Sequence, residues 1–156
     1  MELEYFQMID EVVALDQAAA MSRSRATVPL TSPVFEGHFP GYPLMPGVLL
    51  IETQAQAAGY LILALNGFTR MPFLSGVKDA KLRSFVEPGQ MLDIEARVIH
   101  EGSGYSIAKT AIASGGKKVC DAEILFRIMP FPDDAFAGVM RKRAQQLRLL
   151  TEAGGS

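Results

Sequence analysis

The residues that could do chemistry are gathered in one short stretch of the chain, from His38 to Glu52. His38 stands among glycines and prolines, where an imidazole can be held rigidly beside a cavity. Glu52 stands among apolar residues, where burial would keep a carboxyl group partly protonated. A helix beginning at Gly47 would offer free amides and a positive dipole end to a negatively charged oxygen. A base, an acid and an oxyanion site together suit proton removal next to a carbonyl group, with loss or gain of water.

Each of these residues also has an ordinary structural explanation. A single histidine in a loop is often a hydrogen-bonded structural residue. A single glutamate in a helix can face solvent or pair with an arginine. Residue types alone therefore leave both interpretations open.

The stretch requires a long shaped loop followed by a long buried helix. The prolines and glycines of segment 31–46 argue against a regular helix or a central strand, and long ordered loops are usually functional. Segment 47–65 is apolar on nearly all sides, which predicts a buried helix that begins beside Pro46 and stops at Asn66-Gly67. Because Glu52 and its polar neighbours interrupt the apolar run, a core helix is favoured over a membrane span.

Strand-like segments surround this helix. Apolar and polar residues alternate in them, and glycine-rich turns separate several of them. In the last segment Cys120 lies on the apolar face, so we expect a core residue rather than a nucleophile. The expected strands are 5–15, 20–30, 71–85, 91–100, 105–113 and 117–129. One long apolar helix followed by successive antiparallel strands predicts an α+β domain, with the sheet wrapped around the helix.

The C-terminal part of the chain predicts one more helix. Asp133-Asp134 can cap it, and an apolar stripe follows at helical spacing. The stripe consists of Phe136, Val139, Met140, Ala144 and Leu147. We therefore expect a main domain over 1–132 and a helical extension of the same domain over 133–156, whose last residues, 153–156, should fray.

Composition excludes several classes of protein. The chain has 156 residues, with 15 Lys+Arg, 17 Asp+Glu and a net charge of -2, so nothing draws it to nucleic acid. Its acidic start lacks the features of a signal peptide, and one cysteine excludes an internal disulfide, so we expect a cytoplasmic protein. With one cysteine and only His38 and His100, we expect no metal site.

The stretch from His38 to Gln56 resembles the signature of FabZ-type 3-hydroxyacyl-[acyl-carrier-protein] dehydratases. It reads His-Phe-Pro-Gly-Tyr-Pro-Leu-Met-Pro-Gly-Val-Leu, then Glu52, then Ala55-Gln56. Weaker similarity extends over residues 5–130. The resemblance implies the hot-dog fold, a homodimer or trimer of dimers, and no cofactor. It also implies dehydration of a (3R)-hydroxyacyl chain on the phosphopantetheine arm of acyl carrier protein, giving the trans-2-enoyl thioester, in fatty acid biosynthesis.

The resemblance carries roles onto matching residues. His38 would be the base, and Glu52 of the partner chain would be the acid. Gly47 and Val48 would bind the thioester carbonyl, and Gln56 would orient the carboxylate. Phe39 and Gly76 would line the substrate tunnel.

The chain also departs from the family pattern. The proline-rich opening is missing, Glu11 replaces an arginine, Lys78 stands where Asp is common, and the segment after Phe131 is an addition. The pattern most resembles a FabZ-like branch associated with the dedicated carrier protein for very long lipid A acyl chains.

Carrier docking should need a basic rim, because acyl carrier proteins are acidic. Lys78, Lys81 and Arg83 lie on the strand after Gly76, near the family's pantetheine entrance. Within this cluster Lys81 and Arg83 are our first choice. The second choice is the basic cluster of the last helix, which consists of Arg141, Lys142, Arg143 and Arg148. For that cluster a solvated face is the slightly favoured explanation, because the apolar stripe alone would explain the helix as a packing element that covers the sheet or closes the tunnel.

Two other functions stay open. A hot-dog acyl thioesterase would need an activated water instead of a leaving hydroxyl. A non-catalytic acyl-binding subunit would need neither His38 nor Glu52, so the intact pair argues against it. His100, near a strand end and a glycine turn, is expected to play no part in catalysis.

Overall fold

The computed structural model describes residues 1–149 as one curved sheet and the helices around it. The helical elements are a 3₁₀ turn η1 (Leu3–Tyr5), α1 (Pro33–Gly37), α2 (Gly47–Leu65) and α3 (Asp134–Gln146). The strands are β1 (Glu11–Asp16), β2 (Met21–Thr27), β3 (Arg70–Leu82), β4 (Met91–Gly102), β5 (Tyr105–Ser114) and β6 (Lys117–Pro130). The predicted fraying of 153–156 lies outside the described residues.

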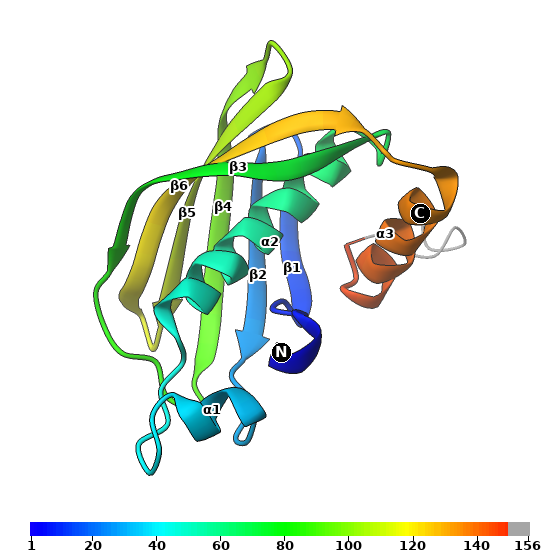
Figure 1. Cartoon of the computed structure of the whole chain (residues 1–156). Helices are drawn as coiled ribbons and strands as arrows, with labels where there is room; N and C mark the ends of the chain where they lie inside the picture. Colours follow the sequence, from blue (N-terminus) through cyan, green and yellow to red (C-terminus); the bar gives the residue numbers. More distant parts are fainter. Residues whose placement is uncertain (150–156) are drawn as a thin grey trace.

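All six strands form a single antiparallel sheet in the order β1-β2-β4-β5-β6-β3. Figure 1 shows this sheet curling around α2, which runs along its concave side. The alternation predicted for β4 is present, since Leu92, Ile94 and Ala96 are buried against the core. The predicted α+β hot-dog architecture is thereby confirmed.

α2 is the core of the molecule and keeps its predicted bounds. Most of its side chains are buried, including Leu50, Ala58 and Leu61. By length and composition alone it could cross a membrane, but 67% of its most apolar window is buried inside the protein. That burial is typical of a core helix.

A buried polar cluster joins α2 to the sheet. Gln54 is fully buried, and its Nε2 donates to Cys120 Sγ at 3.0 Å and to Leu50 O at 3.3 Å. Thr110 Oγ1 lies 3.0 Å from Gln54 Oε1. Every polar group of this glutamine therefore has a partner, as burial demands. Cys120 is buried as predicted, and burial raises the pKa of its thiol, which suits a core residue.

Two local predictions were wrong. Residues 5–10 are not strand, because the chain turns at Phe6 with φ 53° and β1 begins only at Glu11. Segment 31–46 contains a short helix, α1, because the Ser32 hydroxyl accepts from Val34 N and Pro33 suits the first helical turn.

α3 is fixed at its C-terminal half. Asp133 caps it as predicted, accepting from Phe136 N at 2.7 Å. Ala144 and Leu147 are fully buried, whereas Val139 is 62% exposed. The apolar stripe therefore packs only in part. Val12 N also donates to Leu147 O at 2.8 Å, so the end of the helical segment is hydrogen-bonded to β1.

We expect Leu147→Ala to destabilise the protein by about 2–4 kcal/mol, because it removes a fully buried side chain. The same truncation at Leu30, which is 78% exposed, should cost less than about 0.5 kcal/mol. Urea unfolding of both variants measures the difference, and equal losses would mean that α3 does not pack as described.

Candidate active site

His38 follows α1 directly and is held by the loop that leads to α2. Its Nδ1 lies 3.1 Å from Leu44 O. A backbone carbonyl only accepts, so Nδ1 must carry the proton and donate it. In the neutral ring Nε2 is then left as the free acceptor. The ring of Phe39 stacks on the imidazole, with 4.3 Å between ring centres, so His38 is fixed in both position and tautomer.

The start of α2 offers backbone donors. Gly47 and Val48 are the first two helical residues, and amides of the first helical turn have no partner within the helix. Val48 is 72% exposed. A Cβ on residue 47 would meet the tip of Leu82; the glycine therefore lets the end of β3 lie against the helix start.

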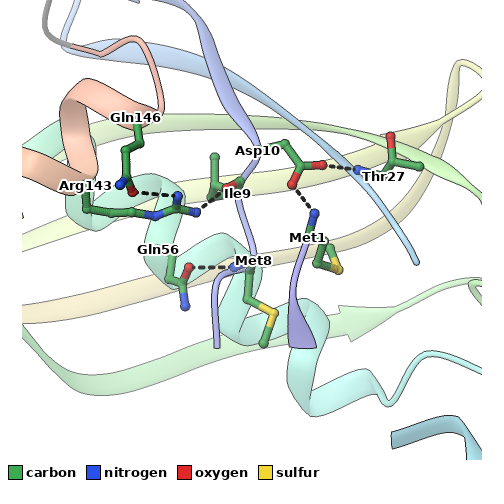
Figure 2. A network of polar contacts seen from close by, with 8 residues as sticks. All are labelled: Met1, Met8, Ile9, Asp10, Thr27, Gln56, Arg143 and Gln146. Atoms are coloured by element: carbon green, nitrogen blue, oxygen red, sulfur yellow. Dashed lines mark hydrogen bonds and ion pairs between the residues drawn. The ribbon is translucent and has the colours of Figure 1, made fainter. Parts of the chain in front are cut away.

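Glu52 is half-buried on α2 and is held by Gln56 one helical turn later. Gln56 Nε2 donates to Glu52 Oε1 at 3.0 Å and to Phe6 O at 2.6 Å. Gln56 Oε1 accepts from Met8 N at 3.0 Å, the contact that Figure 2 shows. Met8 N can only donate and Phe6 O can only accept, so these two groups fix which end of the Gln56 amide is oxygen and which is NH₂. The NH₂ group then donates one hydrogen to Phe6 O and the other to Glu52.

Glu52 and Gln56 open into a groove of about 600 Å³. The groove lies between α2, the N-terminal segment, β3 and α3, and most of its lining is apolar. Its lining residues are Phe6, Gln7, Glu52, Ala55, Gln56, Gly59, Tyr60, Leu63, Met71, Pro72, Leu74, Phe126, Val139, Met140, Lys142, Arg143 and Gln146. A carboxylate thus stands in the wall of an apolar space large enough for an acyl chain.

Other predicted site residues lie elsewhere. His38, Phe39 and Gly76 do not line this groove. Phe39 is 52% exposed beside His38, and Gly76 sits at a register shift of β3 opposite Leu125. The groove of a single chain therefore contains the predicted acid without the predicted base.

The predicted docking residues differ in whether their side chains are paired with a carboxylate. Lys78 and Lys81 are exposed on β3, and neither forms an ion pair within residues 1–149. Arg83 Nε instead lies 2.6 Å from Asp121 Oδ2. This hydrogen bond holds the pKa of the Asp121 carboxyl below its usual value. Arg83 is therefore already engaged with β6.

Most of the basic cluster of the C-terminal helix also makes polar contacts within the chain. Arg141 donates to Gly67 O at 3.1 Å and lies over the ring of Phe68. Arg143 donates to Ile9 O at 2.9 Å and to Gln146 Oε1 at 3.3 Å (Figure 2). Arg148 lies 3.4 Å from Glu11. Arg141, Arg143 and Arg148 therefore each contact another part of the same chain.

Sequence reasoning missed several residues of the groove. The N-terminal segment reaches the site because Gln56 binds it, and no motif signalled that contact. Tyr60 lines the groove beside Arg143; burial raises the pKa of its hydroxyl, and the nearby guanidinium opposes that rise. Gly59 did carry a signal, because a glycine inside a helix is costly and asks for a reason.

No group of three or more His, Cys, Asp and Glu side chains within residues 1–149 is arranged to hold a metal ion. His38, Glu52 and the start of α2 supply an imidazole, a carboxylate and free backbone amides, and such groups can carry out acid–base chemistry.

Solved structures with a similar fold come from several bacteria. A hypothetical thioesterase with coenzyme A from Streptococcus pneumoniae superposes with a TM-score of 0.63 at 13% identity, covering 79% of this chain and 88% of that chain. A Streptococcus mutans protein bound to acetyl CoA gives a TM-score of 0.61 at 12% identity, covering 79% of this chain and 90% of that chain. At such low identity these likenesses show the fold alone.

Sequence comparison is more specific. The FabA-like domain model matches residues 1–123. A FabZ 3-hydroxyacyl-[acyl-carrier-protein] dehydratase of Pediococcus pentosaceus is 41% identical over 100 residues, which are 64% of this chain and 67% of that protein. The FabZ of Caldicellulosiruptor saccharolyticus is 33% identical over 124 residues, 79% of this chain and 88% of that protein. The chain therefore belongs to the FabA-like family, among the FabZ-type dehydratases.

Proposed function

We propose that the protein dehydrates (3R)-hydroxyacyl-[acyl-carrier-protein] to the trans-2-enoyl thioester in fatty acid biosynthesis. Membership of the FabZ-type family supports the reaction class. The observation that carries the mechanism is the pair of fixed groups. His38 has a free Nε2 acceptor. Glu52 lines the groove and accepts a hydrogen bond from the Gln56 side-chain amide.

The proposed reaction uses one proton transfer at each group. His38 Nε2 takes the proton from C2 of the acyl chain, and the electrons of that C–H bond form the C2=C3 double bond. The C3–O bond breaks, and Glu52 in its protonated form gives its proton to the departing hydroxyl, which leaves as water. The amides of Gly47 and Val48 stabilise the thioester oxygen as negative charge develops on it.

The two groups are proposed to meet across a dimer. His38 does not line the groove that holds Glu52. β3 is an edge strand of 13 residues that pairs only with β6, and it exposes Leu74, Val77 and Leu82. A long apolar edge strand invites pairing with a second chain. Association through β3 would bring His38 of one protomer to the groove of its partner, in a homodimer or a trimer of dimers.

Three finer points belong to the same proposal. The resemblance to the lipid A branch favours very long acyl substrates. The single cysteine, buried as a free thiol, favours a reducing, cytoplasmic location. The contacts of α3 with β1 and Phe68 favour one domain in which residues 1–132 carry the activity and 133–156 are an extension.

His38→Ala and Glu52→Gln should each lower turnover by about 10² or more without unfolding the protein, because each removes one acid–base group. Formation of enoyl product from a 3-hydroxyacyl carrier measures the effect. His100→Ala is the matched control, because His100 is exposed and stacks on Tyr105.

Release of free acid instead of enoyl product would indicate a thioesterase. No turnover by the unmodified protein would indicate a binding subunit. An active His38→Ala variant would disprove the mechanism.

Mixing the two inactive variants tests the shared site. A dimer that combines a His38→Ala chain with a Glu52→Gln chain has one site with both groups intact. After subunit exchange, activity should return to about a quarter of that of the unmodified protein, since half the dimers are mixed and half their sites are complete. Sedimentation should show no active monomer. Failure to recover activity in proven mixed dimers would place both groups within one chain.

Carrier docking is proposed to depend on the free lysines of β3. Lys78→Glu and Lys81→Glu should raise KM for a carrier-bound substrate and leave KM for the matching acyl-pantetheine nearly unchanged, because rim charges act on association. Arg83→Glu should behave similarly but also lose the contact with Asp121. Arg23→Glu on β2, away from β3 in the sheet order, is the control. Equal responses of both substrates would refute the assignment.

A further inference from the structure

The groove follows one face of α2 away from the carboxylate. Glu52, Gln56, Gly59 and Leu63 all line it, at spacings of three and four residues. From Glu52 to Leu63 the helix rises about 16 Å at about 1.5 Å per residue. An extended chain advances roughly 1.2 Å per bond, so this face matches an acyl chain of about 13 bonds.

Gly59 leaves a gap in the middle of that face. Glycine in a helix interior costs about 0.5–1 kcal/mol relative to alanine. No neighbour forces the choice, because a Cβ at this position would meet only Pro72 Cγ, at 3.9 Å. The space that a side chain here would fill is therefore the groove itself.

α3 supplies the opposite wall. Val139 and Met140 line the groove, and Val139 stays 62% exposed although it is apolar. Two hydrogen bonds attach the C-terminal end of this helical segment to the start of the chain. Arg143 donates to Ile9 O, and Val12 N donates to Leu147 O. α3 also lies beyond the residues that the family model matches, 1–123.

We propose that the groove holds the distal part of the acyl chain, and that Gly59, Val139 and Met140 determine which chain lengths are accepted. This inference rests on the proposed dehydratase function. Glu52, which would protonate the leaving hydroxyl, lines one end of the groove. A substrate whose C3 hydroxyl lies at Glu52 would therefore have the rest of its acyl chain beside the groove. Gly59 lies about 10 Å along the helix from Glu52, so only medium and long chains reach it.

The experiment compares 3-hydroxybutyryl with 3-hydroxyhexadecanoyl pantetheine thioesters as substrates of the full-length protein. In Gly59→Leu the ratio of long-chain to short-chain kcat/KM should fall by about tenfold or more, because the new side chain occupies the groove. Gly138→Leu is the matched control, since Gly138 lies on the exposed face of α3 with nothing within 4 Å of an added Cβ. It should leave the ratio unchanged.

Met140→Ala provides a second variant that does not depend on inserting a side chain. It removes apolar contact from the wall, so the same ratio should fall by about three- to tenfold through a higher KM for the long substrate. Circular dichroism and thermal unfolding confirm that each variant is folded.

The outcomes separate the two proposals. No enoyl product from either thioester with the unmodified protein would overturn the dehydratase function itself. Turnover with an unchanged length ratio in folded Gly59→Leu and Met140→Ala would overturn the groove assignment alone. Loss of the dimer in Gly59→Leu, seen by sedimentation, would mean that a second copy of the chain fills the groove and would overturn it too.

Discussion

Burial of α2 is the constraint on which the rest of the structure depends. A helix that is apolar on nearly all sides must be covered on most of them, and a single sheet can cover a helix only by curling around it. The six strands do so, and Gln54 joins the helix to Thr110 and Cys120 beneath. One face of α2 lines the groove that β3, the N-terminal segment and α3 enclose, and the carboxylate lies on that face.

This face of α2 links the fold to the chemistry. Gln56 satisfies its own amide by binding the N-terminal segment at Phe6 and Met8, and the same geometry directs its NH₂ group at Glu52. The side chain that anchors the chain terminus therefore also orients the candidate acid. Figure 2 shows the second anchor of this segment, Arg143 of α3 on Ile9 O. The walls of the groove are thus connected to one another by hydrogen bonds.

Several arginines of this molecule contact other groups of the same chain. Arg83, Arg141 and Arg148 lie against Asp121, Phe68 and Glu11, respectively. Such contacts reduce the set of side chains that are free to meet a partner. The net charge of -2 therefore does not indicate where free positive charge lies on the surface. Lys78 and Lys81 of β3 form no ion pair within residues 1–149, whereas the arginines of α3 contact neighbouring groups.

Local patterns in the sequence determined the bounds of α2, the strands β4 to β6, the buried place of Cys120 and the cap of α3, because periodicity and capping are local properties. The motif from His38 to Gln56 indicated the family, and the resemblance to that family implied that Gln56 would orient Glu52. Tertiary structure alone decided that residues 5–10 leave the sheet, that Arg83 binds Asp121, and that Val139 and Met140 form a wall opposite Gly59. These outcomes depend on contacts between residues far apart in the chain. The local spacing of residues does not indicate which distant side chains will come into contact.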